Sequence, residues 1–109
     1  MSERKDIERR GGTGIVLEPA RAEAAPPGRF QVLLLNDDFT PMDFVVHVLQ
    51  AFFAMNQEMA TQLMLQIHTR GRAVAGVYSR EVAESKVNQV NDFSRQNHHP
   101  LLSIMEPLQ

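Results

Sequence analysis

The sequence predicts an α+β fold, in which a small antiparallel sheet and three packed helices follow one another in the order β-α-α-β-α-β. Short apolar runs alternate along the chain with longer segments whose apolar residues recur at helical spacing. These signals begin only at residue 30, because residues 1–29 are rich in glycine, proline, alanine and charged side chains. The 109 residues therefore divide into a disordered N-terminal tail, residues 1–29, and one folded domain, residues 30–109.

The tail holds little apolar surface with which to fold. Its large apolar side chains are Ile7, Ile15, Val16 and Leu17. Ordering the backbone costs about 1–2 kcal/mol per residue, and so few apolar groups do not offset that cost. The run Pro26-Pro27-Gly28 then marks the boundary with the domain.

The first strand and the first helix of the domain are separated by short polar residues. Phe30–Leu35 is a short apolar run, which suits a strand covered on at least one face. Thr40-Pro41-x-Asp43 predicts a helix start, with Thr40 as the N-cap, proline at the first helical position and a carboxylate at the third. The apolar stripe of this helix is Met42, Val45, Val46, Leu49, Phe52 and Phe53.

We expect the remaining elements to be a helix, a strand, a helix and a strand. The second helix begins at Asn56-Gln57-Glu58, and Gly71 ends it. The third helix is capped by Ser79 and ends near the run Asn97-His98-His99-Pro100. The strands before and after this helix cover Arg72–Tyr78 and Leu101–Met105.

The composition excludes several classes of function. The absence of cysteine rules out disulfides, thiolate metal sites and thiol catalysis. No apolar run approaches the roughly 18 residues of a membrane span, and the charged N-terminus does not resemble a secretory signal, so we expect a cytoplasmic protein without a membrane partner. The net charge of −2, with no basic stripe, argues against nucleic acid as a partner.

A polar cluster, Asn36-Asp37-Asp38, follows the first strand directly. These side chains present amide and carboxylate oxygens, so the cluster suits a small cation that bears N–H donors. The same residues are also common turn formers, whose charges are favourable near the start of a helix. Both interpretations remain open at this point.

The first two helices could together supply an apolar hollow beside this polar cluster. Met64, Ile67 and His68 are neighbours on the surface of the second helix, as are Met42 and Val45 on the first. If the helices pack side by side, the hollow has an acceptor-rich mouth, which suits an ammonium beside a hydrophobic group. The alternatives are that the methionines fill the core and that His68 pairs with the helix dipole.

Two further patterns do not define a site. His98 and His99 are adjacent but have no companions at metal-ligand spacing, so we expect no metal and no cofactor. Asp37 and His68 could act as the acid–base pair of a small hydrolase. The sequence offers no nucleophile at a recognisable spacing, so we expect a protein that is not an enzyme.

Five sequence blocks together resemble one family. The segment Leu35–Val45, Leu-Asn-Asp-Asp-Phe-Thr-Pro-Met-Asp-Phe-Val, closely resembles the signature of ClpS, the bacterial N-degron adaptor family. The resemblance covers about residues 30–106, and the other blocks match in the same order: Ala60–His68, Gly76–Tyr78, Glu81–Lys86 and His99–Leu102.

The resemblance implies a fold, a function and partners. The fold is that of the C-terminal domain of the ribosomal stalk protein. The function is to bind proteins whose first residue is Leu, Phe, Tyr or Trp and to deliver them to the ClpA unfoldase, which feeds the ClpP protease. The partners are then the N-terminal domain of ClpA and N-degron proteins or peptides. A structural domain of stalk type, without N-degron binding, is the alternative.

The resemblance also implies roles for individual residues. Asn36, Asp37 and His68 contact the α-amino group of the substrate, and Asp38 shapes the same rim. Glu81 and Lys86 dock on the unfoldase, although from the sequence alone they read as a solvated helix face. The side-chain pocket is lined or gated by Thr40, Met42, Val45, Met64, Ile67 and Leu101.

Three positions depart from the family pattern, at Phe39, at Ile67 and at Thr69-Arg70. The family commonly has tyrosine in place of Phe39, and close relatives have valine in place of Ile67. An aromatic residue often follows the histidine that corresponds to His68, where this chain has Thr69-Arg70. These changes alter the pocket shape and the rim polarity, so they affect the ranking among the four first residues rather than the class of ligand.

Overall fold

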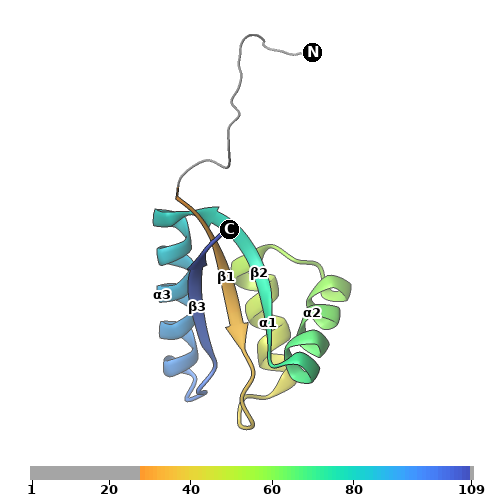
Figure 1. Cartoon of the computed structure of the whole chain (residues 1–109). Coiled ribbons are helices and arrows are strands. Elements are labelled where there is room, and N and C mark those ends of the chain that lie inside the picture. Colours follow the sequence, from red (N-terminus) through yellow and green to blue (C-terminus); the bar gives the residue numbers. More distant parts are fainter. Residues whose placement is uncertain (1–27, 109) are drawn as a thin grey trace.

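The computed structural model describes residues 28–108 and confirms the predicted α+β class and element order (Figure 1). The predicted tail lies outside these residues, except for Gly28 and Arg29. The elements are β1 (Arg29–Leu35), α1 (Met42–Phe53), α2 (Gln57–Arg70), β2 (Arg72–Ser79), α3 (Arg80–Gln96) and β3 (Leu102–Pro107).

The sheet has three strands in the order β2-β1-β3, and both pairings are antiparallel. The apolar run that predicted a covered strand forms β1, which is the central strand of the sheet. The register sets Leu34 opposite Ala73 on β2 and Ser103 on β3. A bulge between Val32 and Leu33 shifts the register with β2.

The three helices pack on one face of this sheet (Figure 1). Val32 and Leu34 point into that core, since alternate residues of a strand share a face. Leu33 points to the opposite face and is still only 4% exposed. Val74 on β2 and Ile104 on β3 lie opposite Leu33 and flank it on that face. Arg72 and Glu106, on the two edge strands, pair at 3.5 Å across β1.

Both ends of α2 confirm the local sequence signals, whereas the start of α1 differs from the one predicted. The Asn56 side chain caps α2 by accepting the Met59 N–H at 2.8 Å, and Gly71 ends that helix with a φ of 92°. The predicted capping box at Thr40 is wrong. Pro41 is the N-cap in an extended conformation, without any side-chain cap, and the helix begins at Met42. The Thr40 hydroxyl instead donates to the Asp37 carboxylate at 2.7 Å, since an ionised acceptor binds a donor more strongly than a neutral one.

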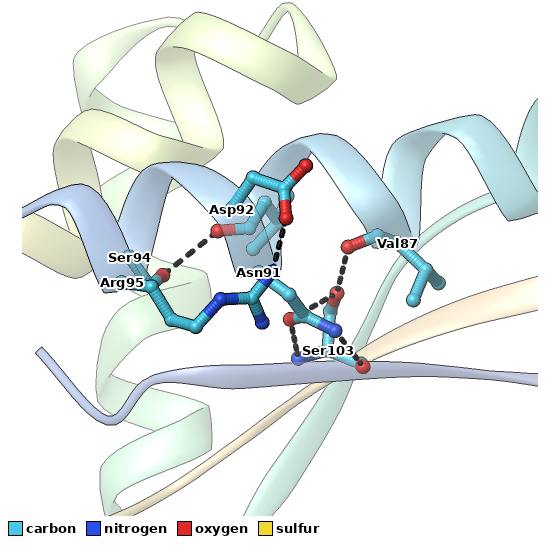
Figure 2. A network of polar contacts seen from close by, with 7 residues as sticks. Val87, Asn91, Asp92, Ser94, Arg95 and Ser103 are labelled. Carbon is cyan, nitrogen blue, oxygen red and sulfur yellow. Dashed lines mark hydrogen bonds and ion pairs between the residues drawn. The ribbon is translucent and has the colours of Figure 1, made fainter.

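A polar seam joins α3 to β3 (Figure 2). The Asn91 amide oxygen accepts the Ser103 N–H at 2.8 Å, and the amide nitrogen donates to the Ser103 carbonyl at 3.2 Å. The Ser103 hydroxyl lies 3.0 Å from the same amide oxygen and 3.3 Å from the Val87 carbonyl. The side-chain amide of Asn91 therefore bonds both backbone groups of Ser103, as the backbone of a neighbouring strand would.

Within residues 28–108, no helix is both long enough and apolar enough to cross a membrane.

Candidate ligand-binding site

A pocket of about 180 Å³ opens at the end of the sheet where β1 leads into α1. Three segments meet there: the β1–α1 loop with the start of α1, the last turns of α2, and the residue before β3. All ten residues that the sequence associates with substrate line this pocket: Asn36, Asp37, Asp38, Thr40, Met42, Val45, Met64, Ile67, His68 and Leu101. The pocket thus joins residues that are far apart in the chain, from Leu35 at the end of β1 to Leu101 before β3.

The floor of the pocket is apolar and belongs to the core. Val45 and Met64 are buried, and Ile67 and Leu101 are only 2% and 3% exposed. Helices α1 and α2 pack against each other, as the hollow predicted from their apolar faces requires. Both descriptions of Met64 are therefore correct, because it fills the core from one side and faces the pocket from the other.

The mouth of the pocket is polar and open to solvent. Asn36, Asp38 and His68 are exposed, while Asp37 and Thr40 are half-buried. Met42 stands at the boundary between floor and mouth, lining the pocket while 46% of its surface stays exposed.

Asp37 organises the loop that forms this mouth. One carboxylate oxygen accepts the N–H groups of Phe39, at 2.8 Å, and of Thr40, at 2.7 Å. The other oxygen accepts the Thr40 hydroxyl. The interpretation of Asp37 as a turn former is therefore correct, and it is compatible with ligand binding. A carboxylate has about four acceptor sites, and these bonds use three of them.

A backbone hydrogen bond joins the rim loop to the end of α2. The Asn36 N–H donates to the Gly71 carbonyl at 2.9 Å. Gly71 ends the helix whose last turn carries His68, so the bond fixes the loop relative to that side chain. This main-chain bond and the hydrogen bonds of the Asp37 side chain therefore fix the geometry of the rim without a ligand.

The two residues expected to dock on a partner lie away from the pocket, on α3. Glu81 is exposed in the first turn, as a solvated face requires. Lys86 is half-buried: its ammonium donates to the Phe52 carbonyl at 2.7 Å and lies 5.9 Å from the Phe53 ring and 5.7 Å from the Tyr78 ring. The solvated-face interpretation is therefore wrong for Lys86, because α1 supplies an unpaired terminal carbonyl within reach.

Sequence reasoning missed two features of the site. Leu35 also lines the pocket, although nothing in its strand pattern marks the last residue as accessible. The bond from Thr40 to Asp37 was missed too, although the Asp-x-x-Thr spacing permits such a turn. His99 packs against Phe44 in an edge-type arrangement, with ring centroids 4.4 Å apart, which gives it a packing role.

Fold and site together define a small α+β domain with a pocket whose floor is apolar and whose mouth presents hydrogen-bond acceptors. The family model described as "ATP-dependent Clp protease adaptor protein ClpS" matches residues 25–104. The chain belongs to the ClpS family of Clp protease adaptors.

Relatives of known sequence agree over most of the chain. The ATP-dependent Clp protease adapter protein ClpS of Xanthomonas oryzae pv. oryzae is 69% identical over 93 residues, which cover 85% of this chain and 88% of that protein. The protein of the same name from Xylella fastidiosa is 64% identical over 92 residues, covering 84% of this chain and 87% of the other.

A solved structure agrees as well. ClpS2 of Agrobacterium tumefaciens, bound to L-phenylalaninamide, superposes with a TM-score of 0.74 at 37% identity. The match covers 76% of this chain and 100% of the other.

Proposed function

We propose that this protein binds the first residue of N-degron proteins, reading the α-amino group and the side chain together, and delivers these proteins to the ClpA unfoldase for degradation by ClpP. One observation carries the proposal: a pocket with an apolar floor opens through a rim of oxygen and imidazole acceptors. The phenylalaninamide bound by the related ClpS2 supports it, because that ligand has the ammonium and side chain of an N-terminal phenylalanine followed by an amide.

The rim suits an ammonium ion. An α-amino group has a pKa of about 7.7–8.0, so near pH 7 it is mostly charged and carries three N–H donors. Asn36 and Asp37 offer oxygens, and a neutral His68 offers one ring nitrogen. Each charge-assisted hydrogen bond contributes roughly 1.5–3 kcal/mol, so a blocked amino group costs much of the affinity.

The floor suits a single large apolar side chain. Burying Leu or an aromatic group contributes roughly 1.5–3 kcal/mol, and association entropy offsets several kcal/mol of the total. The sum corresponds to micromolar or somewhat tighter affinity, which lets an adaptor release its cargo. Met42 at the mouth excludes β-branched first residues by steric overlap.

Delivery is the second half of the proposal. Glu81, exposed on α3, and the nearby Lys86 form the docking surface for the N-terminal domain of the unfoldase. The protein works in the cytoplasm, as a binding module with no catalytic group and no cofactor of its own.

The deciding experiment compares two short peptides that begin with Leu and differ only in the α-amino group, one free and one acetylated. Fluorescence anisotropy at pH 7.5 with the full chain gives both affinities. We expect the free peptide to bind at least about tenfold tighter, since acetylation removes the charge and two donors. Equal binding contradicts recognition of the first residue, and absence of binding by both peptides favours a structural domain of ribosomal-stalk type.

A further inference from the structure

The rim carries an aromatic side chain that the pocket does not use. Phe39 stands between Asp38 and Thr40, which both line the pocket, yet its own side chain is 82% exposed. That is the largest value among the exposed large hydrophobic residues of positions 28–108. A single exposed apolar residue is common on proteins, so its position has to carry any functional argument.

The backbone that presents this ring is fixed. The Phe39 N–H donates to Asp37 at 2.8 Å, and the same oxygen holds the next N–H, that of Thr40, at 2.7 Å. The ring therefore projects from an ordered turn. An aromatic side chain presented in this way provides contact area at little cost in conformational entropy.

The mouth of the pocket is asymmetric. Phe39 and Met42 place exposed apolar surface on the α1 side. The opposite side belongs to the end of α2, where His68, Thr69 and Arg70 are exposed and polar. A polypeptide whose first residue fills the pocket leaves across this rim, and its second side chain is the first one outside.

We propose that Phe39, together with the exposed edge of Met42, forms a second subsite that contacts the second residue of a bound polypeptide and favours an apolar or aromatic side chain there. This inference rests on the proposed function, because it requires the first residue to occupy the pocket. The neighbouring carboxylate of Asp38 also disfavours an acidic second residue, because like charges repel. An aromatic contact of this kind corresponds to roughly three- to tenfold in affinity.

The test measures the coupling between Phe39 and the second residue of the ligand. Three peptides with a free amino group begin Leu-Phe, Leu-Ser and Leu-Asp and are otherwise identical. Their affinities are measured by fluorescence anisotropy for the full-length protein, Phe39→Ala and Phe39→Tyr. Leu65→Ala is the matched control, because Leu65 is 48% exposed on α2 and does not line the pocket.

We expect the full-length protein to prefer Leu-Phe over Leu-Ser by about three- to tenfold, with Leu-Asp weakest. Phe39→Ala should abolish the preference for Leu-Phe over Leu-Ser, while Phe39→Tyr and Leu65→Ala should keep it. An unchanged preference in Phe39→Ala overturns the second subsite. Acetylation of the Leu-Ser peptide then tests the proposed function separately. If the acetylated peptide binds about tenfold more weakly than the free one, only the second subsite is overturned and the proposed function stands. If acetylation has no effect, both proposals fail.

Discussion

Asp37 and Asn91 have side chains of nearly the same shape, and each is half-buried and holds backbone groups in place, yet Asp37 lines the pocket and Asn91 lies in the seam between α3 and β3. Asn91 both accepts from and donates to the backbone of Ser103, so its amide is matched group for group. Asp37 only accepts, taking two N–H groups and one hydroxyl in its own loop.

The two side chains differ in the charge and the hydrogen-bonding capacity that they keep once the fold has formed. A neutral amide has two N–H donors and an oxygen with two acceptor sites, and the α3–β3 seam uses both acceptor sites and one donor (Figure 2). An ionised carboxylate keeps a full charge and about one free acceptor site after three bonds, and it lines a pocket open to solvent. Similar local chemistry therefore stabilises a seam in one region and leaves binding capacity in the other.

The largest effect should follow from removing the charged acceptor. We expect Asp37→Ala to weaken binding of a Leu-first peptide at least about tenfold, because it removes a charge-assisted contact and releases the loop. Asp37→Asn separates the two causes, because an amide oxygen can still hold both N–H groups of the turn. Unchanged affinity in Asp37→Ala, measured by fluorescence anisotropy, would show that Asp37 serves the loop alone.

The seam should affect stability and leave binding intact. Asn91→Ala removes two bonds to the backbone of Ser103, which is 1% exposed, so we expect the free energy of unfolding to fall by about 2 kcal/mol. Urea unfolding measures this change, and peptide affinity should stay within about twofold. Asn88→Ala, exposed one turn earlier on the same helix, is the control. A large loss of affinity in Asn91→Ala would mean that the seam and the pocket are coupled.

The gate at the mouth gives a smaller effect, on specificity. Met42→Ala should admit peptides that begin with Val or Ile, since it relieves overlap worth about 1–3 kcal/mol. Met59→Ala is the control, because Met59 is also exposed but does not line the pocket. Continued rejection of Val and Ile by Met42→Ala would remove Met42 as the gatekeeper.

The smallest expected effect is on stability and concerns Lys86, which donates a hydrogen bond to the Phe52 carbonyl and also has a proposed docking role. Lys86→Met keeps the aliphatic stem and loses the bond to the Phe52 carbonyl, so we expect a loss of about 1 kcal/mol in stability. Thermal unfolding measures this loss, and peptide binding should not change, because Lys86 does not line the pocket. Unfolding identical to that of the unmodified protein would show that the contact contributes nothing and that Lys86 is free for a partner.

Signals within a few residues predicted the element types and several of their ends. Asn56 and Ser79 cap their helices with the side chains expected, and Gly71 ends α2 in the left-handed region. These features depend on contacts between chain neighbours, so the sequence contains all the information needed. Thr40 failed as a cap because the stronger acceptor, Asp37, competes for its hydroxyl within the same loop.

The residues of the candidate site were named from the sequence, but their common location was not determined by it. The acceptor cluster, the helical spacing of Met64, Ile67 and His68, and the family resemblance identified the groups. Their roles in binding remain predictions for the peptide experiments to test.

The sequence by itself determined which segments form strands and helices, because periodicity and capping are properties of short stretches of chain. It also determined that an acceptor cluster stands beside an apolar helix start. Only the tertiary structure decided that Leu35 also lines the pocket, that Lys86 turns inward to the end of α1, and that the ring of Phe39 stays outside. Each of these depends on the packing of elements far apart in the chain, which no local pattern specifies.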